Sequence, residues 1–193
     1  MTDRMDKLRA RLSEARDALE TEIDARRDAI RYRFEGARVV FEDDLRRTHR
    51  AARENLTDFL KRTRLLVVLT APLIYALIVP LVLLDLCVSL YAAVCFPVYG
   101  IAPVRRRDHM AVDRHHLAYL NALQKLNCVY CGYGNGVLSL AREVASRTEA
   151  YWCPIKHARR TADPHDRMAA FADYGDAAGF FGETERQRER LGK

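Results

Sequence analysis

The first 60 residues lack a hydrophobic run and lack an excess of either charge. Residues 1–60 contain 14 Lys/Arg and 14 Asp/Glu residues. A secretory signal has an apolar core segment, so we expect no such signal at this end of the chain. The formal net charge of the whole chain is +6. Because basic residues are interleaved with acidic ones through most of the sequence, the pattern does not favour a nucleic-acid-binding protein.

Cysteine is also scarce, with five among the 193 residues. Five scattered cysteines do not make the framework of a disulfide-rich domain. Cys87 and Cys95 lie in an apolar stretch, where a thiol most often packs as a small hydrophobic side chain. The other three cysteines lie in the C-terminal half of the chain, near His157. Because cysteines and a histidine occur together in this part of the chain, metal binding is the function to consider for these three cysteines.

Proline is absent between residues 6 and 59, and Gly36 is the one glycine there. Apolar positions recur every 11 residues, as in the series Leu8, Leu19, Ile30, Phe41 and Ala52. Eleven residues in three turns is close to the period of a straight α-helix. The sequence therefore predicts a long amphipathic helical arm over residues 1–62. We expect the apolar stripe of this helix to be buried between copies of the chain, in a homo-oligomer formed through residues 5–60. The alternatives are that the helix lies on the membrane surface or packs on the C-terminal part of the chain.

Charge is almost absent from residues 65–104, where Asp85 is the one formally charged residue. One straight helix of that length would measure about 60 Å, twice the hydrocarbon thickness of a bilayer. Pro80 is a natural break, because proline deletes a helix hydrogen bond and clashes with the preceding turn. We therefore expect residues 63–104 to form a membrane-embedded helical hairpin, re-entrant or just spanning. A single span followed by an interfacial helix is the alternative.

Basic clusters flank this apolar run on both sides, at residues 61–64 and 105–107. Lys and Arg are enriched in the cytoplasmic loops of membrane proteins. The sequence therefore predicts an inner (cytoplasmic) membrane location with both termini on the cytoplasmic side.

Asp85 is the polar exception within the apolar run. A carboxylate inside hydrocarbon is costly, which makes it a functional candidate. Its structural alternatives are a position at the far interface or a local hydrogen bond, either to Ser89 one turn on or to Thr70 or Tyr75 across the hairpin.

Glycine is concentrated in "CVYCGYGNG", residues 128–136, between two helical patterns at 113–127 and 137–151. We expect this stretch to break the chain between two helices. The form C-x2-C-x21-C-x3-H then supplies three thiolates and one imidazole, a ligand set that zinc prefers. The sequence predicts a small helical metal-binding domain over residues 105–160, with zinc held by Cys128, Cys131, Cys153 and His157.

A second arrangement of the same region stays open. If the two helices form a tight antiparallel pair, Cys153 and His157 approach the start of the first helix. The further candidate ligands there are Asp113, His115 and His116. The first two cysteines would then stand alone as a dithiol. Iron or an iron–sulfur cluster is a less common use of such ligands, and buried cysteines without metal are a third possibility.

Two stretches, "DRHHLAYLNALQKLNCVYCGYGNG" at 113–136 and "YWCPIKHARR" at 151–160, resemble a group of uncharacterised small bacterial membrane proteins. The likeness covers roughly residues 85–165 and leaves the arm aside. It implies a membrane location and no particular activity, so it adds no catalytic residue.

Together these patterns predict an all-α membrane protein that ends in a charged, partly disordered tail over residues 161–193. We expect a membrane-anchored, self-associating scaffold in which zinc stabilises the small Cys/His domain, whose size is near that at which a metal is commonly needed. The expected partners are the lipid bilayer and other copies of the chain, and not nucleic acid. The alternative is a membrane-bound metal- or thiol-dependent redox enzyme that uses the Cys/His cluster. The sequence does not decide between an enzyme and a scaffold.

Overall fold

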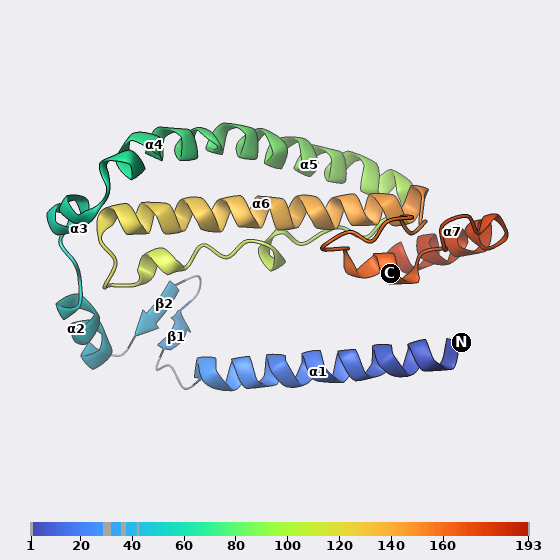
Figure 1. Ribbon diagram of the computed structural model, residues 1–193, viewed down its shortest axis with the longest axis horizontal. Helices are drawn as coiled ribbons and strands as arrows, with labels where there is room; N and C mark the ends of the chain where they lie inside the picture. The colour runs from blue at the N-terminus through green and yellow to red at the C-terminus, as the bar shows by residue number, and fades with distance from the viewer. Residues whose placement is uncertain (1, 29–31, 36–37, 42, 193) are drawn as a thin grey trace. The chain divides into compact units, whose positions relative to one another are not determined.

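The computed structural model describes residues 2–28, 32–35, 38–41 and 43–192. Most of these residues are helical (Figure 1), so a mainly α-helical protein is confirmed, with one short β-hairpin as the exception. The chain divides into two compact units. Unit 1 comprises Met1–Asn55 and His116–Asn121, and unit 2 comprises Leu56–His115 and Ala122–Lys193.

Unit 1 contains two helices and a two-stranded sheet. Its elements are α1 (Thr2–Asp28), β1 (Tyr32–Glu35), β2 (Arg38–Phe41) and α2 (Asp43–Ala51). The strands pair antiparallel, with Glu35 opposite Arg38. The ring of His49 lies edge-on to both Phe41 and Tyr119, with 5.1 Å between ring centroids in each pair. This histidine therefore joins β2, α2 and the residues 116–121 within the unit.

The single arm helix predicted over residues 1–62 is wrong. α1 ends at Asp28, and β1 and β2 occupy part of the stretch before α2. Residues 32–41, "YRFEGARVVF", combine aromatic and β-branched side chains around Gly36, a composition that favours a hairpin over a helix. The 11-residue series counted Phe41 as helical, whereas it ends β2. Another member of that series, Ile30, lies outside the described residues.

Unit 2 contains the remaining helices. They are α3 (Leu56–Arg62), α4 (Leu65–Ala76), α5 (Ile78–Tyr99), α6 (Ala122–Trp152) and α7 (Ala177–Leu191), with short 3-10 turns at Arg106–Asp108, Arg114–His116 and Asp166–Ala170. α4 and α5 run beside α6 in the same direction (Figure 1). Tyr75 donates a hydrogen bond to Asn127 near one end, and Tyr99 contacts Trp152 at the other end.

The membrane hairpin predicted over residues 63–104 is also wrong. α4 continues into α5 as one gently bent rod (Figure 1), and Leu77 between them keeps helical angles of φ −63° and ψ −13°. Pro80 falls in the first turn of α5, just after the interruption at Leu77, and there the rod bends gently and does not fold back. Within the described residues, one helix, Leu65–Tyr99, is long and apolar enough to cross a membrane.

Much of the α4–α5 surface is apolar and uncovered. Along the inner half, Asp85 and Phe96 are buried where α5 packs on α6. The rod exposes 15 large hydrophobic side chains, on one side of α5 and on all sides of the start of α4: Leu65, Leu66, Val67, Val68, Leu69, Leu73, Ile74, Leu77, Val79, Val82, Leu83, Leu86, Leu90, Val94 and Val98. We call this set the apolar face.

The chain break predicted at residues 128–136 does not occur, because α6 runs unbroken through this stretch. The glycines there serve close packing instead of a turn. Gly134 faces Leu81 of α5, whereas Gly132 and Gly136 face the backbone of residues 109–112. Each glycine costs about 1 kcal/mol of helix propensity relative to alanine. The close packing of α5 and of residues 109–112 on two sides of α6 offsets that loss of helix propensity.

The hydrophobic core lies where the C-terminal ends of α5, α6 and α7 meet. Its buried members are Phe96, Ile101, Leu140, Val144, Ala150, Phe171 and Leu191. The tail predicted to be partly disordered is in fact ordered in α7. Asp176 caps this helix by accepting the Gly179 N–H at 2.9 Å, and Leu191 is buried at its end. The tail therefore adds to the core.

Candidate functional site

The four predicted zinc ligands do not meet. Cys128 and Cys131 lie one turn apart on α6, where the first is half-buried and the second is exposed. Cys153 and His157 follow the end of the same helix and are both exposed. The 22 residues from Cys131 to Cys153 correspond to about 33 Å of helix. One ion cannot be bound by both pairs within this chain, and the prediction of a joint site is wrong in that respect.

The alternative ligand set does not form either. Of the helix expected over residues 113–127, the part from Ala122 onward belongs to α6, whereas residues 113–121 form a 3-10 turn and non-helical chain. Asp113 is exposed and His115 is half-buried, and both follow Val112, which packs against Gly132. That position on α6 is 21 residues from Cys153, or about 32 Å. His116, also half-buried, lies in unit 1.

No group of three or more His, Cys, Asp or Glu side chains is placed to hold a metal ion in the part of the chain that the structure describes. All five cysteines are free thiols. Cys128 and Cys131 can still act together as a dithiol, because residues three apart on a helix are neighbours. Zinc binding stays a prediction that would need further ligands.

Asp85 is the centre of a polar cluster between α5 and α6. Arg106 donates to both carboxylate oxygens, the bidentate geometry of strong arginine–carboxylate pairs. Tyr133 of α6 donates to Oδ2 at 2.9 Å, and Ser89 donates to Oδ1 at 3.3 Å. The expected contact with Ser89 is confirmed. The carboxylate is thus fully paired, which explains how it is tolerated in an apolar helix.

The other two expected partners of Asp85 bond elsewhere. Tyr75 donates to the side chain of Asn127 on α6, and Thr70 donates to the carbonyls of Leu66 and Val67 on its own helix. Neither belongs to the Asp85 cluster.

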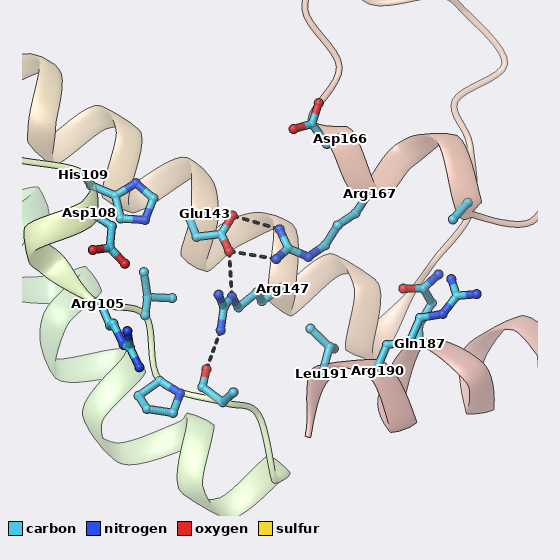
Figure 2. Close-up of a pocket in the computed structure, with 14 residues that line it drawn as sticks. Arg105, Asp108, His109, Glu143, Arg147, Asp166, Arg167, Gln187, Arg190 and Leu191 are labelled. Atoms are coloured by element: carbon cyan, nitrogen blue, oxygen red, sulfur yellow. Dashed lines mark hydrogen bonds and ion pairs between the residues drawn. The ribbon is translucent and has the colours of Figure 1, made fainter. Parts of the chain in front are cut away.

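A polar pocket of about 840 Å³ lies at the C-terminal end of α6 (Figure 2). Its lining includes four arginines and three acidic residues: Arg105, Arg147, Arg167, Arg190, Asp108, Glu143 and Asp166. Glu143 points between two of the arginines. Arg147 donates to it at 2.7 Å and also donates to the Ala102 carbonyl, while Arg167 contributes two bonds of 2.8 Å.

The two arginines determine the charge of Glu143. Burial by itself would raise the pKa of this carboxyl, but the hydrogen bonds and positive charges of Arg167 and Arg147 outweigh it and lower the pKa from 4.5 to about 2. Glu143 is therefore ionised at neutral pH and is not a general acid there. Its two arginines tie α6 to residues 102 and 167, so this cluster stabilises the pocket wall.

Acid should weaken this cluster. Because the folded-state pKa of Glu143 is depressed, its stabilisation is complete above about pH 4.5 and is lost as the pH falls toward 2. The shift corresponds to about 3 kcal/mol. Glu143→Gln should lower the melting temperature at pH 7 and flatten the acid dependence, whereas exposed Glu185→Gln in α7 should change neither. Thermal unfolding in detergent at several pH values would show this; an equal loss for Glu143→Gln at pH 7 and pH 3 would contradict it.

The sequence did not predict the side-chain interactions of Arg106, Tyr133, Glu143 and Arg167. One signal was present, because Glu143 and Arg147 are four residues apart, the spacing of a helical ion pair. Arg106 reaches Asp85 across 21 residues, and Arg167 reaches Glu143 across 24 residues of partly irregular chain. No local pattern marks such contacts. No protein-family model, curated protein or solved structure matches the chain, so its function rests on its own residues.

Proposed function

We propose that this protein is a membrane-anchored, self-associating helical scaffold at the cytoplasmic face of the inner membrane. The observation that carries the proposal is the apolar face of α4–α5, with 15 exposed large hydrophobic side chains and no charged residue among them. Burying one such side chain contributes about 1.5–3 kcal/mol. Soluble monomers rarely expose a contiguous apolar patch of this extent. Lipid is the solvent that such a surface requires.

The anchor can be tested by membrane partition. Wild-type protein should sediment with the membrane fraction and resist extraction by high salt and alkaline carbonate. Leu83→Glu combined with Leu90→Glu places two charges on the apolar face and should move most of the protein to the supernatant or to a carbonate-extractable pool. Exposed Arg160→Glu is the matched control and should leave partition unchanged. Wild-type protein that is fully soluble without detergent would refute the anchor.

Self-association is supported by α1. Its side chains Leu8, Leu12, Leu19 and Ile23 are exposed, at spacings of four, seven and four residues. Leu8 and Leu19 are 11 residues apart, as are Leu12 and Ile23, a period that gives a nearly straight or slightly right-handed helical seam, and an exposed seam favours a partner helix. The proposed partner is α1 of another copy.

Disrupting the seam should therefore dissociate the oligomer. Leu12→Glu with Leu19→Glu should reduce the detergent-corrected mass in light scattering to that of a monomer. Arg11→Glu with Arg16→Glu changes charge beside the seam and should reduce it far less. An unchanged mass in the leucine variant would assign self-association to another surface, and membrane partition should stay the same in every case.

The structural zinc site remains a prediction and is not the basis of the scaffold proposal, because the two ligand pairs lie about 33 Å apart along α6. The redox-enzyme alternative has no specific support. No cysteine lines the polar pocket, and its Glu143 is held in ion pairs.

A further inference from the structure

A helix of 35 residues can cross a bilayer or lie along its surface. We infer that α4–α5 lies along the membrane surface, with its apolar face in the lipid and α6 on the side toward water. The inference rests on the proposed membrane anchor and names how that anchor meets the bilayer.

Unit 2 is layered around α6. Gly134 of α6 faces Leu81 on α5, whereas Gly132 and Gly136, about 200° away around the helix, face residues 109–112. Three stretches of chain therefore run side by side: the α4–α5 rod, α6, and the non-helical return segment after Gly100 (Figure 1). The rod forms one outer layer and the return segment covers the opposite side of α6.

A crossing orientation would carry the return segment into the bilayer. α5 and α6 run in the same direction, so the chain between them must come back through the same slab. That segment is mostly non-helical, and irregular backbone exposed to lipid leaves polar groups unsatisfied at several kcal/mol each. It also carries exposed Arg105, Arg107 and Asp108. Each charge near the bilayer centre adds a further cost.

α6 itself does not suit a crossing. Its uncharged stretch runs from residue 126 to residue 141, between Lys125 and Arg142. Sixteen residues cover about 24 Å, less than the roughly 30 Å of hydrocarbon. A surface orientation avoids both problems, because the whole polar side of unit 2 stays in water.

The two ends of the rod fit the boundary between lipid and water. Exposed Arg62 and Arg64 immediately precede α4, where they can contact anionic headgroups. At the other end, Trp152 packs edge-on against Tyr99 with 5.5 Å between ring centroids. Trp and Tyr concentrate at membrane interfaces. A helix lying flat on the membrane keeps both of its ends at the depth of this interface. If a second copy covered the apolar face instead, neither the two arginines nor the Trp152–Tyr99 pair would have a role.

Depth measurement along the rod tests the inference. In full-length protein with its five cysteines replaced by alanine, a fluorophore is attached at Leu73→Cys, Leu83→Cys or Val94→Cys. Vesicles of phosphatidylethanolamine and phosphatidylglycerol carry nitroxide quenchers at graded depths. All three labels should be quenched at the same depth, within about one helical turn of 5 Å. A label at exposed Arg160→Cys is the control and should report water.

Each other result overturns the inference in a recognisable way. Leu73 and Val94 are about 32 Å apart on the rod, so a crossing helix would place the middle label about 15 Å deeper than the outer two; that result leaves the anchor intact. Protein that stays in the supernatant with unquenched labels overturns both the inference and the anchor. Labels shielded from water but not quenched by lipid would show a second copy on the apolar face.

Reporters fused at residues 1 and 193 give an independent test. They should be active on the same side of the membrane, whereas a crossing helix predicts opposite sides.

Discussion

Replacing Arg106 with leucine should destabilise the protein more than replacing Asp85, although the two form one ion pair. The Asp85 side chain is 11% exposed and the Arg106 side chain is 47% exposed. Without Arg106, the carboxylate keeps only the hydroxyls of Tyr133 and Ser89, and an unpaired buried charge costs about 3–5 kcal/mol. Without Asp85, the arginine can turn toward water, so Asp85→Leu should cost about 1 kcal/mol.

The double variant separates the ion pair from simple loss of contact. Asp85→Leu with Arg106→Leu removes both charges and should recover most of the stability lost in Arg106→Leu, because apolar replacement of a buried pair is often close to neutral. Thermal unfolding in detergent, followed by circular dichroism, measures the set. Exposed Arg107→Leu is the matched control and should stay near wild type. Equal losses for the two single variants, with no recovery in the double, would count against the ion pair.

Adding methyl groups to one side of α6 should also destabilise the protein, against the usual preference of helices for alanine. A Cβ at Gly132 would lie 2.9 Å from the Ala111 carbonyl oxygen, and a Cβ at Gly136 would lie 2.8 Å from Met110 Cγ. Overpacking of this kind costs about 1–3 kcal/mol per site, and each alanine returns about 1 kcal/mol of helix propensity. The double Gly→Ala variant should therefore lose about 2 kcal/mol.

The matched control is Gly182→Ala in α7. The nearest heavy atom to its added Cβ is Arg186 Nη1 at 3.9 Å, so propensity acts there without a clash. This variant should be more stable by up to about 1 kcal/mol. Unfolding curves of the purified proteins measure the change in stability of both variants, a loss in α6 and a gain in α7, in one experiment. If the double variant in α6 is stabilised as well, the close approach of residues 109–112 is not a tight contact.

Local sequence signals predicted some elements well and misled at others. The charge-free run at 65–104 predicted apolar helices suited to lipid, because apolar composition determines which solvent such a helix needs, but it was expected to fold back as a hairpin and instead forms one bent rod. Pro80 suggested a fold-back, but a proline can also kink a helix without ending it, and Pro80 lies next to the gentle bend at Leu77. Residues 32–41 had the composition of strands, and the 11-residue period obscured it.

The candidate site was harder to predict for a physical reason. Spacing such as C-x2-C-x21-C-x3-H fixes distances only once the path of the chain is known. A turn at residues 132–136 would have brought the ligand pairs together, whereas a continuous helix holds them about 33 Å apart. The choice between turn and helix depended on the backbone at 109–112, which packs on Gly132 and Gly136 and is not a local neighbour in sequence.

The sequence by itself determined that the protein is mainly helical, that residues 65–99 are apolar and helical, and that Asp85 needs a partner. These follow from composition and from contacts within one or two turns, such as Ser89 to Asp85. Only the tertiary structure decided that α6 is continuous, that Arg106 and Tyr133 pair with Asp85, and that Arg167 pairs with Glu143. Those contacts join residues 21 to 48 positions apart, where the favourable free energy comes from burial and charge pairing between segments and not from the preferences of any one segment.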